Sequence, residues 1–224
     1  RVNYNLKSKY LVTASFRSDG SSRFLKKNRW SSFASGAIAW RANSEDFLKD
    51  VRWLSNLKLR ASWGMTGNNN LGNHSYLPQL STPVNAGYMF GNSYSTGGYP
   101  INMGNEDLVW ETTRQTDLGV DLGLFKQRLT MTVDVYRKNT SDLLLNAKLP
   151  PSAGYPSQYL NIGKVRNEGL EFTLTGVIVD NKKFRWASTF NIAFNKNKVM
   201  ALGQDEYSRL TSQYWGDDWV LIPG

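Results

Sequence analysis

The 224 residues contain no cysteine and one histidine, His74. Without cysteine the chain has no disulfide and no thiolate for catalysis or metal binding. One histidine is too few for a histidine-based metal cluster or a catalytic triad. The sequence also lacks a glycine-rich phosphate loop and the spaced oxygen ligands of a calcium loop. We therefore predict that the chain holds no metal or cofactor.

The sequence also lacks a run of about 18 apolar residues, which excludes a transmembrane helix within it. A strand that crosses a membrane needs no such run, because its lipid-facing residues alternate with those of the opposite face. Hydrophobic residues make up 40% of the chain and the mean hydropathy is −0.47. These values are compatible with a membrane protein built from strands.

Negative charge is scarce relative to positive charge, and the formal net charge is +9. The densest basic cluster is LKKNR at residues 25–29, and no run of five basic residues occurs. A dispersed excess is typical of solvated loops and polar strand faces rather than of a nucleic-acid surface. We therefore expect no nucleic-acid partner.

Two neighbouring segments, residues 116–124 and 129–136, show a regular alternation. In a strand successive side chains point to opposite faces, so the alternation predicts a hairpin with one apolar and one polar face. Each segment has about the length of a tilted strand that crosses a bilayer, roughly 9 to 11 residues. The apolar positions are Leu118, Val120, Leu122, Leu124, Leu129, Met131, Val133 and Val135.

The pattern recurs in five more segments, which predicts an all-β antiparallel meander of about seven strands. The further segments are residues 9–17, 30–41, 57–65, 170–175 and 185–195. Short turns near Lys126 and Asn181 alternate with long connections at residues 66–107 and 139–165. Successive connections of a meander lie at opposite ends, so one end has tight turns and the other long loops, as in outer-membrane barrels.

Two smaller features complete the predicted architecture. Ser44, followed by Glu45 and Asp46 and then by a few apolar residues, predicts a helix of about two turns. Aromatic residues near strand ends predict belts at the membrane surfaces. These aromatic residues are Tyr10, Trp30, Trp40, Trp110, Tyr136 and Trp186. A soluble β-sandwich is the alternative, since its strands also alternate, although they are usually shorter.

Several motifs occur in order along the chain and resemble one family. They are YLVTASFRSDGSSRF at 10–24, WLSNLKLRASWG at 53–64 followed by TGN at 66–68, LVWETTRQT at 108–116, NIG at 161–163 with NEGLE at 167–171, and NKNKV at 195–199. Minor departures are NED at residues 105–107 and Glu168 at a position where the family pattern has lysine. With these motifs the chain resembles the SusC/RagA group of TonB-dependent outer-membrane transporters of Bacteroidetes.

The resemblance implies a large β-barrel in the 22-stranded class with long extracellular loops and short periplasmic turns. It further implies import of oligomeric nutrients, glycan oligosaccharides or peptides, across the bacterial outer membrane, by a protein that is not an enzyme. TonB supplies the energy in such proteins, a SusD-like surface lipoprotein acts as a lid, and transporter–lipoprotein pairs dimerise. Residues 1–224 are then expected to form part of the barrel domain, with the plug domain and the C-terminal strand outside this segment.

Two sets of candidate site residues follow. The polar face is expected to line the lumen, with Lys58, Arg60, Asp117, Asp121, Asp134, Glu171 and Arg185 exposed to water, where they tune passage or pair with one another. Loop residues are candidates for binding substrate, because amides and carboxylates bond sugar hydroxyls and aromatic rings stack on sugars. These are Asn68, Asn69, Asn70, Tyr214, Trp215, Asp217 and Trp219; stiffening of the loop by Asx turns is the other reading of the asparagines.

Three alternative functions remain open. A barrel of this kind can import a siderophore or vitamin, or serve as a structural or adhesion barrel without a lipoprotein partner. A soluble carbohydrate-binding β-sandwich is the third possibility. In the sandwich the apolar faces of the strands must pack against a second sheet, whereas in the barrel they face lipid.

Overall fold

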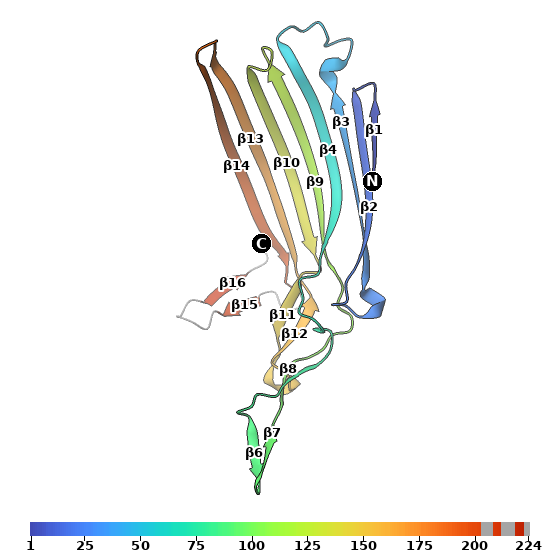
Figure 1. Ribbon diagram of the computed structural model, residues 1–224, viewed down its shortest axis with the longest axis vertical. Coiled ribbons are helices and arrows are strands. Elements are labelled where there is room, and N and C mark those ends of the chain that lie inside the picture. The colour runs from blue at the N-terminus through green and yellow to red at the C-terminus, as the bar shows by residue number, and fades with distance from the viewer. Residues whose placement is uncertain (203–207, 212–217, 222–224) are drawn as a thin grey trace.

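One curved sheet of eight antiparallel strands forms most of the chain (Figure 1). This computed structural model describes residues 1–202, and the backbone alone of residues 208–211 and 218–221. The strands pair in chain order, which makes the sheet a simple meander. They are β1 (Val2–Leu6), β2 (Tyr10–Gly20), β3 (Trp30–Arg41), β4 (Leu54–Asn68), β9 (Glu111–Leu124), β10 (Leu129–Ser141), β13 (Lys164–Asp180) and β14 (Arg185–Ala201).

The register aligns the apolar positions of neighbouring strands into rows that cross the sheet. One row runs through Val12, Ile38, Ala61, Leu118, Val135, Leu170 and Phe194. On this face Ile38 is 60% exposed, Leu118 57% and Phe194 58%. The row therefore belongs to a broad apolar band that no second sheet of the described chain covers, which is the arrangement of a barrel wall rather than of a sandwich. The predicted antiparallel barrel meander is confirmed.

The connections at one end of the sheet are short. Residues 7–9, 125–128 and 181–184 each close a hairpin, and the connection from β3 to β4 contains the 3₁₀-helix η2 (Ala42–Ser44). This end is called the tight end, and it lies at the top of Figure 1. Lys126 and Gln127 have positive φ angles of 56° and 65°. Positive φ at both central positions is the geometry of the tight turns that match strand twist.

The connections at the opposite end, called the loop end, are long and contain structure of their own. The 3₁₀-helix η1 (Lys26–Asn28) lies between β2 and β3, and η3 (Pro151–Ala153) between β10 and β13. Four short strands follow β4: β5 (Gln79–Ser81), β6 (Gly87–Phe90), β7 (Ser93–Thr96) and β8 (Tyr99–Asn102). The remaining pairs are β11 (Leu144–Lys148) with β12 (Ser157–Asn161), and β15 (Ser208–Thr211) with β16 (Asp218–Leu221).

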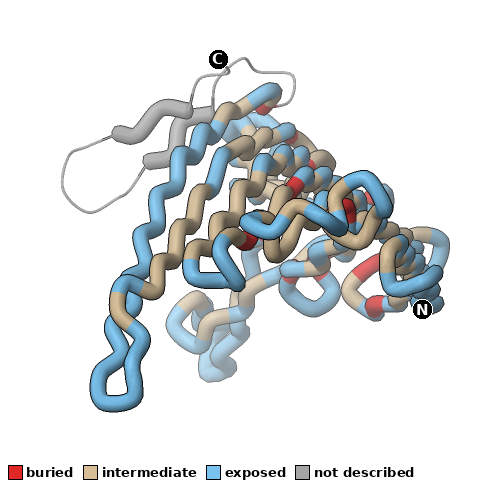
Figure 2. The backbone as a smooth tube through the Cα atoms, turned by 90° about the horizontal axis from the view of Figure 1, so that it is seen from above, coloured by how far each residue is buried: buried red, intermediate tan, exposed pale blue. Residues whose placement is uncertain are grey.

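A small hydrophobic core closes the loop end. Phe24 and Leu108 are completely buried, and they pack with Phe33, Leu71 and Trp110. The ring centroids of Phe24 and Trp110 are 5.4 Å apart, and those of Phe33 and Trp110 are 5.8 Å apart. Few other residues are buried, as Figure 2 shows. The core joins residues from β3 and from three loops, so it fixes the loops to the sheet.

The structure corrects several predictions from the sequence. The helix expected to begin at Ser44 is absent: the 3₁₀-helix η2 ends at Ser44, Glu45 is extended (φ −82°, ψ 151°), and only turns follow before β4. β1 is an eighth strand, and the long loops contain short hairpins. Trp110 is not part of an aromatic belt, because it is buried in the core, and Tyr136 is on the polar face of β10. No helix in the described ranges has the length and apolar character needed to span a membrane.

Candidate functional site

The polar face of the sheet is centred on Arg60 in β4. Its guanidinium donates from Nε to Asp121 Oδ2 and from Nη2 to Asp121 Oδ1, both at 2.9 Å. The same Nη2 donates to Asp134 Oδ1 at 2.9 Å. Lys58 Nζ lies 3.9 Å from Asp121 Oδ2. Four of the predicted lumen-facing residues are therefore brought together in one ion-pair network across β4, β9 and β10, called the Arg60 network here.

A glycine makes room for this network. Gly119 lies opposite both Arg60 in β4 and Asp134 in β10. A Cβ at position 119 would come within 2.7 Å of Arg60 Cζ, which is closer than side chains tolerate. The absence of a side chain there allows the guanidinium to lie flat across β9 and to reach both carboxylates. Two parallel N–H···O bonds to one carboxylate are also the strongest way in which arginine pairs.

The other predicted lumen-facing residues lie outside the Arg60 network. Asp117 is nearer the loop end, where its carboxylate accepts from Ser62 Oγ at 3.0 Å and from Gln115 Nε2 at 2.8 Å. Glu171 lies directly opposite Asp134, and it makes no ion pair within the described part of the chain. Arg185 begins β14 at the tight end, where Asp180 is its partner in register. This polar wall therefore carries more acidic than basic side chains.

The three asparagines at the end of β4 are used mainly by the loop itself. Asn68 Oδ1 accepts the backbone N–H of Asn70 at 3.1 Å, which is an Asx turn, and Asn68 Nδ2 donates to Glu111 at 3.2 Å. The carbonyl of Asn69 accepts from Arg23 Nη1 at 3.1 Å. Asn68 and Asn70 are nevertheless exposed. The structure thus displays the loop-stiffening role, and ligand binding by these residues stays a prediction.

The second predicted loop cluster is almost entirely beyond the described residues. Tyr214, Trp215 and Asp217 fall in residues 212–217, outside the described ranges. Trp219 belongs to β16, and its backbone is paired with that of Leu210 in β15. Its role in binding therefore also stays a prediction.

Two groups of exposed polar and aromatic residues were not among the predicted site residues. On the polar face, Tyr136 Oη donates to Asn195 Oδ1 at 2.7 Å and its ring covers Gly169. At the loop end, the hairpin of β6 and β7 carries Tyr88 and Phe90, whose ring centroids are 5.1 Å apart. Strand alternation places Tyr136 on the face opposite to that of Val135, which is the polar face. The pair Gly91–Asn92 is typical of a hairpin turn. The sequence therefore contained a signal for each of the two groups.

At the tight end, three side chains donate hydrogen bonds to the carboxylate of Glu45. Its carboxylate accepts from Tyr10 Oη at 2.6 Å, from Lys9 Nζ at 2.9 Å and from Trp40 Nε1 at 3.1 Å. The hydrogen bond from Tyr10, followed by those from Lys9 and Trp40, lowers the pKa of Glu45 to about 2. The turn therefore holds the polar tips of two aromatic residues whose rings lie on the apolar face. Across the described residues, no group of three or more histidine, aspartate or glutamate side chains is arranged to hold a metal ion.

Comparison with known proteins gives a consistent result. The family model described as TonB dependent receptor-like, beta-barrel matches residues 1–221. A TonB-dependent receptor of Formosa agariphila is 39% identical over 207 residues, which is 92% of this chain and 19% of that protein. The TonB-dependent receptor SusC of Bacteroides thetaiotaomicron is 41% identical over 205 residues, 90% of this chain and 20% of SusC.

A solved structure agrees with the sequence comparison. The RagAB peptide importer in the closed-closed state superimposes with a TM-score of 0.84 and 29% identity, covering 99% of this chain and 24% of the matched chain. The 224 residues thus span about a fifth of the length of the curated relatives that they match.

Proposed function

This chain belongs to the TonB-dependent receptor-like β-barrel family, in the SusC/RagA-like group, and we propose that it forms part of the wall of an importer of oligomeric nutrients. Receptors of this family are outer-membrane proteins, and the loop end faces the cell exterior. The proposed cargo is a glycan oligosaccharide or a peptide. The proposed role of these residues is to line and shape the passage, without chemical conversion of the cargo.

The observation that carries this proposal is the division of one continuous sheet into two faces. The apolar rows face away from the Arg60 network in every long strand, so one side suits lipid and the other suits water. On the polar side the central charges are paired with each other in the Arg60 network, while Asp117 accepts only from the neutral Ser62 and Gln115. A wall of this kind offers hydrogen-bonding groups to a polar oligomer along its path, and at its centre the charges that would retain the oligomer most strongly already bind each other.

The energy and the lid are proposed from the family. We propose that TonB drives displacement of a plug domain contributed by another part of the receptor. We also propose that a SusD-like surface lipoprotein covers the loop end, and that two such pairs associate. The long loops of this chain support the proposal of a lid, because they project from the sheet at the end opposite the tight turns (Figure 1).

Two cargo classes compete, and one observation bears on each. The resemblance of the sequence motifs to the SusC/RagA group supports a glycan, and the match to a peptide importer supports a peptide. Siderophores and vitamins are less favoured, because the motifs and the relatives belong to the SusC/RagA group. The test is binding of size-graded oligosaccharides and peptides to the full-length receptor, measured by isothermal titration calorimetry. We expect one class to bind more tightly as the oligomer lengthens.

Transport is tested in cells that express the full-length receptor. The cargo is the tighter-binding oligomer from the calorimetry, labelled with a fluorescent dye. Its uptake should stop when the proton gradient that energises TonB is dissipated. Asp117→Asn on the polar face should lower the uptake rate. Asp180→Asn makes the same chemical change near the tight end and should leave the rate unchanged. Uptake that survives without the gradient, or binding of monomers as tight as that of oligomers, would contradict the proposal.

A further inference from the structure

The apolar face of the sheet ends in a band of positive charge at the loop end. In register across four strands lie Thr116, Arg137, Glu168 and Lys196, directly beyond the apolar row of Leu118 to Phe194. The next row on the same face is Arg114, Asn139, Arg166 and Lys198. These two rows together are called the basic rim. They contain five cations and one carboxylate, which leaves a net charge of +4.

The carboxylate and the amide of the basic rim leave most of its charge unbalanced. Arg137 Nε is 3.1 Å from Glu168 Oε2, which is an exposed ion pair. Arg166 Nε donates to the uncharged Asn139 Oδ1 at 2.9 Å. Within the described ranges, Arg114, Arg166, Lys196 and Lys198 are in no ion pair. Four cations thus stay free to bind an external anion.

The position of the basic rim along the strands fits the depth of lipid head groups. A strand advances about 3.4 Å per residue, so the two rows lie roughly 7 and 14 Å beyond the last apolar row before strand tilt is considered. Lysine and arginine at this depth place their stems along apolar surface and their charges in the head-group layer. Polybasic surfaces in that layer attract anionic lipids.

The charge is confined to one end of the face. Toward the tight end, the same face of β9, β10, β13 and β14 carries residues such as Leu122, Met131, Leu174 and Phe190, and none of the described strand positions is charged. Near the loop end, the corresponding face of β2 and β3 carries the exposed rings of Phe16 and Trp30 instead. Among the described residues, the basic rim is therefore a local feature of four strands and not a general property of this face.

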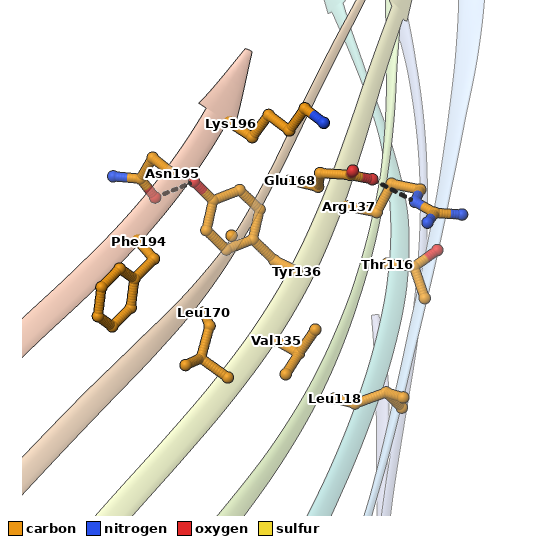
Figure 3. Close-up of a pocket in the computed structure, with 11 residues that line it drawn as sticks. Thr116, Leu118, Val135, Tyr136, Arg137, Glu168, Leu170, Phe194, Asn195 and Lys196 are labelled. Atoms are coloured by element: carbon orange, nitrogen blue, oxygen red, sulfur yellow. Dashed lines mark hydrogen bonds and ion pairs between the residues drawn. The ribbon is translucent and has the colours of Figure 1, made fainter. Parts of the chain in front are cut away.

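A shallow groove connects the basic rim to the apolar band. It has a volume of about 620 Å³, and Leu118, Val135, Leu170 and Phe194 line one end while Arg137 and Lys196 line the other (Figure 3). An amphiphile with an anionic head and an apolar tail matches both ends at once. A soluble anion would match only the cations, and a neutral lipid only the apolar end.

We propose that the basic rim binds a phosphorylated lipid of the outer leaflet, with the phosphate on Arg114, Arg166, Lys196 and Lys198 and an acyl chain in the groove. Arginine and lysine bind phosphate by charge-assisted hydrogen bonds, and arginine does so with two parallel bonds. This proposal rests on the orientation given in the proposed function, with the loop end at the cell exterior, and it does not depend on which cargo is imported.

The test compares lipid binding by two variants of the full-length receptor in detergent. The rim variant is R114Q/R166Q/K196Q/K198Q. The matched control is K7Q/K126Q/K182Q/K183Q, which removes the same charge from turns at the tight end. The probes are lipid A with its phosphates, the same lipid after dephosphorylation, and inorganic phosphate, all measured by native mass spectrometry.

We expect phosphorylated lipid A to bind the wild-type receptor and the control equally, and the rim variant about tenfold or more weakly. Dephosphorylated lipid should bind all three receptors weakly, and inorganic phosphate should not compete at equal concentration. Equal lipid binding by all three receptors, or equal loss in the control, would overturn the proposal. Loss of a protein partner from the rim variant with lipid binding unchanged would assign the basic rim to that partner instead.

Folding of each variant is checked by heat-dependent migration on a gel. If the fourfold substitution prevents folding, a second variant keeps the proposal testable. E168Q removes the single carboxylate of the basic rim and releases Arg137 from its ion pair. Phosphorylated lipid A should then bind more tightly than to the wild type. A purely structural role of the Arg137–Glu168 pair predicts no tightening, so unchanged or weaker binding by a folded E168Q receptor would also overturn the proposal.

Discussion

Removal of Arg60 is the most direct perturbation of the polar wall. Arg60→Ala deletes three charge-assisted hydrogen bonds, two to Asp121 and one to Asp134. It also leaves these carboxylates and Glu171, which lies opposite Asp134, without the cation that neutralises part of their charge. Like charges on neighbouring strands repel, so the substitution should destabilise the sheet by more than the lost bonds alone.

The magnitude follows from the exposure of the Arg60 network. The side chain of Arg60 is 34% exposed and that of Asp121 25%, so solvent screens these ion pairs in part. An exposed ion pair contributes about 0.2 to 1 kcal/mol, and a buried hydrogen bond to a charged group about 1.5 to 3 kcal/mol. Taking about 0.7 kcal/mol for each of the three bonds, and adding the repulsion among the carboxylates, we expect Arg60→Ala to lower the free energy of unfolding by at least about 2 kcal/mol.

The assay is urea unfolding of the full-length receptor in detergent, followed by tryptophan fluorescence. Arg60→Lys is the control, because lysine keeps the charge but not the planar fork, and it should cost about half as much. In a double-mutant cycle, Asp121→Asn in the Arg60→Ala background should cost less than Asp121→Asn alone. A cost below about 0.5 kcal/mol for Arg60→Ala, or additive effects in the cycle, would refute the network as a stabilising unit.

Three further predictions concern the two ends of the sheet. The lowered pKa of Glu45 means that its ionised form stabilises the fold; this effect is complete above the ordinary glutamate range and is lost as the pH falls toward about 2. Between pH 5 and 2 the urea midpoint of Glu45→Gln should therefore fall less steeply than that of the wild type. Phe24→Ala should lower the free energy of unfolding by about 3 to 5 kcal/mol, and Phe24→Leu by much less, in the same assay; equal costs would contradict tight packing of the core. Gly67→Ala should cost about 1 to 3 kcal/mol because its Cβ would come within 2.7 Å of Phe33 Cε1, whereas Gly154→Ala, in open space with a φ of 74°, should cost about 1 kcal/mol through strain alone.

The alternation of apolar and polar residues predicted the sheet because the facing of side chains along a strand is a local property of the chain. The positions of Leu118, Val135 and their neighbours on one face depend only on the two-residue period of a strand, which the sequence contains in full. The tight turns followed in the same way from residues 125–128 and 180–183. The meander order then required that consecutive long strands pair with one another, whether a short turn or a long loop joins them.

Other features depended on contacts that are distant in sequence. Trp110 is an aromatic residue near a strand end, which is typical of a membrane-surface belt. In the structure it is buried by Phe24 and Phe33, which come from two other segments of the chain. Glu45 has the sequence context of a helix start. In the structure its backbone is extended, and Lys9, Tyr10 and Trp40 donate hydrogen bonds to its carboxylate. The Arg60 network was predicted only as a set of polar residues on one face. Its selection of Asp121 and Asp134 depends on the register of three strands and on the space above Gly119.

The hairpin of β6 and β7 gives the molecule a natural place for a reporter. It reaches farthest from the tight end, and its tip is exposed around Gly91 and Asn92 (Figure 1). The native residues include no thiol, so a cysteine at Asn92 is the single maleimide target in these 224 residues. A dye there projects outward from the barrel wall and away from the Arg60 network. Fluorescence from intact cells can then count surface-displayed receptors and record when something closes over the loop end.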